Sequence, residues 1–159
     1  MTAHRLPDLA EHSPLILLIN GPNLDLLGVR EPEVYGTATL DEHVAVARAE
    51  ADRHGLRLEA VQTNHEGAAV DAVHSARGRA AAIIINPGAL THYAWTLHDA
   101  LAIFEGPVVE LHLSNPAARE PWRHRSVVAP VATASITGLG GDGYRLAVTA
   151  VAGLLARQA

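Results

Sequence analysis

The chain has 159 residues, 48% of them hydrophobic, which is enough for one domain with a substantial apolar core. It contains no cysteine, and this excludes disulfides, thiolate nucleophiles and cysteine-ligated metals. The formal net charge of −5 argues against a nucleic-acid partner, and no apolar run is long enough to span a membrane. All 12 of the Lys and Arg residues are arginine, so no lysine is present to form a Schiff base or to hold a pyridoxal cofactor.

The segment Met1–Pro14 is polar, contains His and Pro, and lacks the apolar run and the cleavage pattern of a signal peptide. We expect residues 1–14 to form a flexible tail and residues 15–159 to form one catalytic domain. A cytoplasmic location is the corresponding expectation.

The first half of the domain alternates an apolar run with an amphipathic segment. Leu15–Ile19 is continuously apolar, which is typical of a central strand. The segment Gly21–Thr37 is rich in Gly and Pro and is long for a connection, and long loops in compact domains are usually functional or disordered. Thr39 and Glu42 form a capping-box signal at the start of a helix that ends at Gly55.

The same alternation continues to the end of the chain. It predicts strands at Leu56–Val61, Ala81–Ile85, Val108–Leu113 and Ala134–Thr137, and helices at Glu66–Ala76, at Thr91–Phe104 and after the turn Gly138–Gly143. Five strands that alternate with helices favour an α/β fold, a flavodoxin-like three-layer sandwich around a five-stranded parallel sheet of order 2-1-3-4-5. In that order, ligands bind beyond the carboxyl ends of the first and third strands, which singles out the loops that start at Asn20 and Asn86 and the end of the fourth strand.

The fourth strand carries the strongest chemical signal. Alternation places the apolar residues on one face and the polar ones on the other, namely Val109, Leu111 and Leu113 against Glu110, His112 and Ser114. A strand covered on both faces is normally apolar on both, so Glu110 and His112 need a reason. Either helices cover that face poorly and the pair satisfies itself in the core, or His112 is a general acid or base held by Glu110. A carboxylate partner favours the charged imidazolium.

The first long loop offers a second candidate group. Arg30 and Tyr35 are costly choices for a linker, although an exposed arginine and a tyrosine that packs the loop would explain them equally well. The alternative is that Tyr35 is a base. Free tyrosine has a pKa of about 10, so a phenolate near neutrality needs a close positive charge, and Arg30 is the local candidate. The loop would also have to close over the substrate and exclude water.

Other segments carry weaker signals. Asn86 lies where a substrate hydroxyl could be recognised, and Thr91 is expected to cap the following helix. The run Arg119–Arg125 is either a solvated surface or an arginine clamp for an anionic substrate just beyond His112. The glycines of Gly138–Gly141 lack the spacing of a dinucleotide fingerprint, and the ten histidines show no zinc-type pairing.

Together these segments resemble the type II 3-dehydroquinate dehydratases. The matching segments follow the family's order and cover nearly everything from the first strand to the last helix: Ile19–Leu24, Arg30–Pro32 with Tyr35-Gly36, Gln62–Gly67, Asn86–Ala89 with Thr91-His92, Glu110–Asn115, and Gly138–Gly140 with Gly143-Tyr144. Each segment alone is a weak signal, but the ordered set is highly specific.

The resemblance implies a lyase that removes water from 3-dehydroquinate to give 3-dehydroshikimate, in the shikimate pathway of aromatic amino acid biosynthesis or in quinate catabolism. It implies that Tyr35, as a phenolate stabilised by Arg30, takes a proton alpha to the ketone. By the same resemblance, Asn23 holds a water that stabilises the enolate, and His112, supported by Glu110, protonates the departing hydroxyl. No cofactor and no metal are implied.

The resemblance also extends to substrate contacts and assembly. The implied substrate-binding residues are Asn86, His92, Asp99, Leu113, Ser114 and Arg123, with Asp99 lying near a neighbouring subunit's site. The implied partners are 3-dehydroquinate and further copies of the chain, in a homododecamer of four trimers. The sequence departs from the family pattern at Asp25, Ala117, Val127 and His98, none of which is a core catalytic position.

Two other functions stay open at this point. One is a non-catalytic flavodoxin-like binding or regulatory domain, which would not need Arg30, Tyr35, Glu110 and His112 together. The other is a different lyase or isomerase on the same scaffold.

Overall fold

A parallel sheet of order β2-β1-β3-β4-β5 runs through the middle of the protein, which a computed structural model describes over residues 13–158. Its strands are β1 (Leu15–Asn20), β2 (Arg57–Gln62), β3 (Ala82–Asn86), β4 (Val108–His112) and β5 (Ala134–Thr137). The predicted α/β class, strand number and flavodoxin-like order are confirmed. The tail predicted over residues 1–14 lies, apart from Ser13 and Pro14, outside the described residues.

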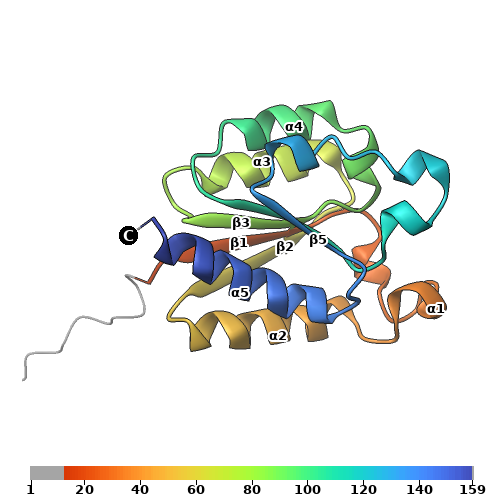
Figure 1. Cartoon of the computed structure of the whole chain (residues 1–159), viewed down its shortest axis with the longest axis horizontal. Helices are drawn as coiled ribbons and strands as arrows, with labels where there is room; N and C mark the ends of the chain where they lie inside the picture. The colour runs from red at the N-terminus through yellow and green to blue at the C-terminus, as the bar shows by residue number, and fades with distance from the viewer. Residues whose placement is uncertain (1–12, 159) are drawn as a thin grey trace, which may run out of the picture.

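Helices cover both faces of this sheet (Figure 1). The helices α2 (Leu40–Arg53) and α5 (Asp142–Ala156) pack on one face, and α3 (Glu66–Ala76) and α4 (Trp95–Ala102) pack on the other. The central strands β1 and β3 are therefore buried at every position, whereas the edge strands β2 and β5 alternate. This explains why β1 and β3 read as continuous apolar runs in the sequence.

Most element bounds agree with the predictions to within one or two residues. The capping box is present, because the Thr39 hydroxyl accepts from the Glu42 backbone N–H and the Glu42 carboxylate accepts from the Thr39 backbone N–H. The segment Gly21–Thr37 is less irregular than expected, since it contains a 3₁₀ turn and the short helix α1 (Pro32–Tyr35). None of the helices described between residues 13 and 158 is both long and apolar enough to cross a membrane.

Two predictions around residue 91 are wrong. The helix predicted over Thr91–Phe104 is shorter, because a 3₁₀ turn (Gly88–His92) and an irregular step at Tyr93 precede α4. Thr91 does not cap that helix, since its hydroxyl contacts Glu110 and Ser126 instead. The buried carboxylate competes successfully for the hydroxyl proton, which capping statistics for a single segment cannot show.

The register of the strands determines which residues meet at the carboxyl edge. Asn20 is level with Asn86 on one side and with Gln62 on the other, at the point where the strand order reverses. The chain turns tightly there, because the Gly21 backbone N–H donates to the Asn86 carbonyl oxygen at 2.7 Å. A Cβ at Gly21 would lie 2.4 Å from the Pro87 carbonyl oxygen, so only glycine fits.

Candidate active site

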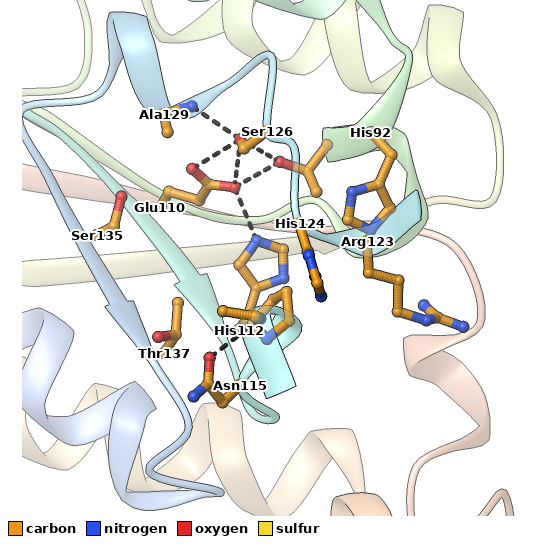
Figure 2. Close-up of a pocket in the computed structure, with 13 residues that line it drawn as sticks. His92, Glu110, His112, Asn115, Arg123, His124, Ser126, Ala129, Ser135 and Thr137 are labelled. Atoms are coloured by element: carbon orange, nitrogen blue, oxygen red, sulfur yellow. Dashed lines mark hydrogen bonds and ion pairs between the residues drawn. The ribbon is translucent and has the colours of Figure 1, made fainter. Parts of the chain in front are cut away.

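Two neighbouring cavities open at the carboxyl edge of the sheet and share four lining residues, which are His92, His112, Pro116 and Arg123. The larger has a volume of about 200 Å³ and extends over the polar face of β4 and β5, where Glu110, Ser135 and Thr137 lie (Figure 2). The smaller, of about 50 Å³, brings Tyr35 and Asn86 together with His112. His112 therefore faces both spaces, and the predicted base and acid belong to one site.

The two polar residues of β4 form a close pair. His112 and Glu110 are two positions apart and share one face of the strand, and their Nε2 and Oε1 atoms are 2.7 Å apart. The Glu110 side chain is 2% exposed and that of His112 is 11% exposed, so the pair is largely shielded from water. This geometry favours the prediction that His112 exchanges a proton while Glu110 supports it.

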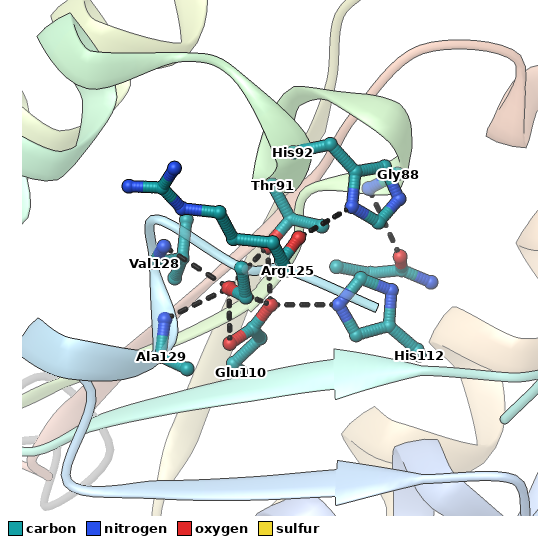
Figure 3. Close-up of polar contacts among 10 residues, drawn as sticks. Gly88, Thr91, His92, Glu110, His112, Arg125, Val128 and Ala129 are labelled. Atoms are coloured by element: carbon teal, nitrogen blue, oxygen red, sulfur yellow. Dashed lines mark hydrogen bonds and ion pairs between the residues drawn. The ribbon is translucent and has the colours of Figure 1, made fainter. Parts of the chain in front are cut away.

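Three donors surround the Glu110 carboxylate (Figure 3). Besides His112, the hydroxyls of Thr91 and Ser126 donate to it, the latter at 2.9 Å from Oε1 and 3.1 Å from Oε2. Burial alone would raise the pKa of Glu110, but the hydrogen bonds from His112, Thr91 and Ser126 outweigh it and hold that pKa below its usual range. Glu110 is therefore ionised near neutrality, and its negative charge lies directly beside the imidazole of His112.

Tyr35 enters the site from the end of α1 and makes its closest contact with Arg119. The Arg119 Nη1 atom donates to the Tyr35 Oη atom at 2.8 Å, and it also donates to the Ser114 hydroxyl at 3.2 Å. Arg30, the predicted partner, has its guanidinium carbon 5.6 Å from the Tyr35 ring centroid, and its Nε pairs with the Glu31 carboxylate at 3.0 Å. Two arginines therefore flank Tyr35, and Arg119 is the one that contacts its hydroxyl oxygen.

Asn86 is held at the end of β3 by a buried polar chain. Its Nδ2 donates to the Tyr144 hydroxyl at 3.3 Å, and that hydroxyl donates to the Asn20 Oδ1 at 2.8 Å. Burial raises the pKa of Tyr144, although the hydrogen bond with Asn86 opposes this, so the phenol stays neutral and keeps its proton for donation. The Asn86 Oδ1 accepts from the Gly88 backbone N–H at 3.3 Å, which fixes the orientation of the amide.

The remaining predicted residues lie at different distances from this centre. Leu113, Ser114, His92 and Arg123 line the smaller cavity with Tyr35. Asn23 has a left-handed backbone (φ 66°), and its N–H donates to the Asn64 Oδ1 at 2.9 Å. Its chain neighbour Leu24 lines the cavity, but Asn23 itself is not among the lining residues.

Asp99 is exposed on α4 and lines neither cavity of the described chain. The Arg119–Arg125 run divides, since Arg119 and Arg123 line the smaller cavity whereas the Arg125 guanidinium stacks on Trp95. Between residues 13 and 158, no group of three or more His, Asp or Glu side chains is arranged to hold a metal ion.

Two contacts of the site were not predicted individually. Arg119 was only part of a charged run, and nothing in the run shows which of its arginines turns toward a tyrosine 84 positions earlier. Ser126 carries no sequence signal, because it is a single serine in an irregular segment. His98, a departure from the family pattern, has its Nδ1 2.6 Å from the carbonyl oxygen of Val127, which is buried.

The chain matches a protein-family model described as dehydroquinase class II over residues 14–152. It is 56% identical over 137 residues to a protein of Corynebacterium efficiens named 3-dehydroquinate dehydratase 1, covering 86% of this chain and 91% of that protein. It is 54% identical over 137 residues to the catabolic 3-dehydroquinase of Aspergillus clavatus, with 86% and 91% covered. The crystal structure of a type II dehydroquinase from Propionibacterium acnes superposes with a TM-score of 0.85 at 42% identity and covers 89% of this chain and 97% of that one.

Proposed function

Because the chain belongs to the dehydroquinase class II family, we propose that it is a type II 3-dehydroquinate dehydratase that works through an enolate intermediate. The relatives' names support the dehydration of 3-dehydroquinate to 3-dehydroshikimate, whether the pathway is biosynthetic or catabolic. The observation that carries the mechanism is the meeting of Tyr35, with its arginines, and His112, with its carboxylate, at one cavity.

The first step is removal of a proton from the carbon alpha to the ketone by the Tyr35 phenolate. Arg119 donates directly to the Tyr35 oxygen, and the Arg30 guanidinium lies near the ring, so both charges favour the phenolate over the phenol. The products of this step are a neutral tyrosine and an enolate. Asn23 holds the water that stabilises the enolate oxygen, a role that rests on the family resemblance and on its position beside Leu24 at the cavity.

The second step is expulsion of the hydroxyl group beta to the ketone. The imidazolium of His112 gives its proton to the leaving oxygen, so that water departs as the enolate collapses to the conjugated enone. Glu110 is buried, ionised and 2.7 Å from His112, which keeps the imidazole protonated and oriented. Proton exchange with water then returns Tyr35 and His112 to their starting states.

Asn86, His92, Leu113, Ser114 and Arg123 bind the substrate in this proposal. By the family resemblance, Asn86, His92 and Arg123 contact the substrate hydroxyls, and Leu113 and Ser114 hold its carboxylate. The amide of Asn86 is oriented by Tyr144 and Gly88 before the substrate arrives. The smaller cavity adjoins the larger one, and Tyr35 lies at its wall. We therefore expect the loop that carries Arg30 and Tyr35 to open for entry and to close over the bound ring.

The reaction needs no imine, since the chain contains no lysine, and in this proposal it needs no metal. We further propose a cytoplasmic homododecamer in which Asp99 of one copy lies near the site of the next. Light scattering on the purified protein measures the mass of the assembly, and about 200 kDa is expected for twelve chains of 16.8 kDa.

The decisive experiment is to add 3-dehydroquinate and to follow the absorbance of the conjugated enone. No rise at high enzyme concentration would contradict the assignment and favour a non-catalytic binding domain or a different lyase. We predict that Tyr35→Phe and His112→Ala each lose at least about 100-fold in kcat, the usual contribution of a positioned proton donor or acceptor, while far-ultraviolet circular dichroism stays unchanged. Near-full activity of Tyr35→Phe would exclude the phenolate, and inhibition by chelators would point to a metal.

A further inference from the structure

A short irregular segment, Arg125–Ala129, ties several parts of the site together (Figure 3). Its backbone binds the turn before α4, because the Val127 N–H donates to the Thr91 carbonyl oxygen at 2.7 Å and the Arg125 carbonyl oxygen lies 2.7 Å from the His92 Nδ1. The side chain of Ser126, which belongs to this segment, donates a hydrogen bond to Glu110 on β4 (Figure 2). The segment therefore contacts both the substrate-binding His92 and the support of the proposed acid.

The direction of the Ser126 hydroxyl follows from a count of its hydrogen bonds. A serine hydroxyl has one proton to donate and two lone pairs that accept. The backbone N–H groups of Val128 and Ala129 donate to the Ser126 Oγ at 3.1 Å and 2.9 Å, which occupies both lone pairs. The single proton then points away from these amides, where the acceptors within reach are the Glu110 oxygens at 2.9 Å and 3.1 Å and the Thr91 oxygen at 2.6 Å. The charged carboxylate is the stronger acceptor of the two groups, so we assign the proton to Glu110.

The same count determines what Thr91 does. The Thr91 and Ser126 hydroxyl oxygens are 2.6 Å apart, but Ser126 has no lone pair left to accept from Thr91. The Thr91 proton therefore goes to the Glu110 Oε1, as its contact with that oxygen indicates. Glu110 consequently receives two hydroxyl protons, from Thr91 and Ser126, in addition to the bond with His112.

We infer that Ser126 is a positioning residue for the acid–base pair: two backbone amides fix its hydroxyl, and the hydroxyl holds the Glu110 carboxylate against His112. This inference rests on the proposed role of His112 as the proton donor. A carboxylate held in this way stays ionised and cannot turn from the imidazole, so His112 meets the substrate already protonated and oriented.

Other ionisable groups face the same space and share in its titration. His112 comes from β4, His92 from the turn before α4, and Arg123 and His124 from the 3₁₀ turn that precedes the segment. All of these become or remain cationic as the pH falls, so they oppose protonation of Glu110 from several sides. Replacing Ser126 removes one hydrogen bond from an uncharged donor to Glu110 and leaves the neighbouring positive charges in place.

The test compares Ser126→Ala with Ser126→Thr, which keeps a hydroxyl, and with Ser75→Ala as the matched control. Ser75 is exposed on α3, where its hydroxyl donates to the Ala72 carbonyl oxygen. Two quantities are measured: kcat and KM for enone formation against pH, and the titration of the Glu110 carboxyl carbon by nuclear magnetic resonance.

We expect Ser126→Ala to lower kcat by about tenfold or more with KM changed by less than about twofold, because a hydrogen bond to the charged Glu110 is lost and neither residue is among the proposed substrate-binding residues. The Glu110 titration and the acidic limb of kcat should both move to higher pH, since a less stabilised carboxylate is protonated earlier. Ser126→Thr should restore both, and Ser75→Ala should match the wild type.

A Ser126→Ala enzyme with an unchanged Glu110 titration would overturn the inference, even if kcat fell, because the effect would then be structural only. If that variant does not fold, Ser126→Cys replaces it, since a thiol has a similar shape but donates weakly, and the same direction of change is expected. The carboxyl titration does not depend on turnover. A wild type without enone formation would therefore refute the proposed function while leaving the hydroxyl–carboxylate contact open to its own test.

Discussion

Replacement of Arg119 by methionine would remove the cation that contacts Tyr35 while keeping an unbranched side chain. Two unit charges about 4 Å apart attract each other by about 4 kcal/mol in surroundings of effective dielectric 20. This value is an upper bound for the contribution of Arg119, because its side chain is 18% exposed and water screens its charge. Removing a hydrogen bond to a charged group costs about 1.5–3 kcal/mol. We therefore expect kcat/KM to fall by about 10- to 150-fold.

The assay is enone formation against pH for Arg119→Met, Arg119→Lys, Arg30→Met and, as a remote control, Arg48→Met, which changes an exposed position of α2. In Arg119→Met kcat/KM should fall at every pH assayed, because the cation that contacts the Tyr35 oxygen is lost. Arg119→Lys keeps a charge and should recover part of the loss. A loss below about threefold in Arg119→Met, with a larger loss in Arg30→Met, would refute the conclusion that Arg119 is the cation that matters for Tyr35.

Two further predictions concern stability. Burial lowers the pKa of His43, and the charge of Glu42 only partly offsets this effect. The unfolded chain therefore binds a proton at higher pH than the folded protein does, so the free energy of unfolding should decrease as the pH falls below about 6.5. His43→Phe keeps the stack on Tyr144 and should flatten that dependence in urea unfolding. An unchanged slope would show that His43 does not titrate differently on unfolding. Gly21→Ala should lower the free energy of unfolding by at least about 1–3 kcal/mol, since its Cβ would meet the Pro87 carbonyl oxygen at 2.4 Å, whereas Gly67→Ala in α3, with no atom within 4 Å, should be neutral or stabilising. Equal melting temperatures for the two variants would contradict this.

The sheet and the Glu110–His112 pair could be predicted from the sequence because both depend on short-range periodicity. Continuous apolar runs identify β1 and β3 as central strands, and a period of two places Glu110 and His112 on one face of β4 at hydrogen-bonding distance. The same reasoning placed Asn86 at the switch point, where the register confirms that it is level with Asn20.

The contacts that hold Tyr35 could not be predicted in the same way. The sequence around Tyr35 shows no hydrophobic periodicity, and Arg119, which contacts the Tyr35 oxygen, is distant in sequence. The predicted partner Arg30 instead forms an ion pair with its neighbour Glu31. Thr91 illustrates the same limit, because a local capping preference lost to a buried carboxylate contributed by another strand. Such contacts are decided by how the loops cross the carboxyl edge, and one chain's local pattern carries little information about that.

The two halves of the proposed chemistry therefore differ in how they are held. The acid is built on the sheet, where Glu110 is fixed by donors from three separate segments and is almost fully buried. The base is built on α1, which has no buried residue, and its oxygen is anchored by one long-range contact from Arg119. Substitutions in the core beneath β4 should thus leave the acid in place until the fold is lost, whereas changes in the loop that carries Arg119 should alter the base while the protein stays folded. This difference matches the chemistry, because the base must move aside to admit the substrate and the acid need not.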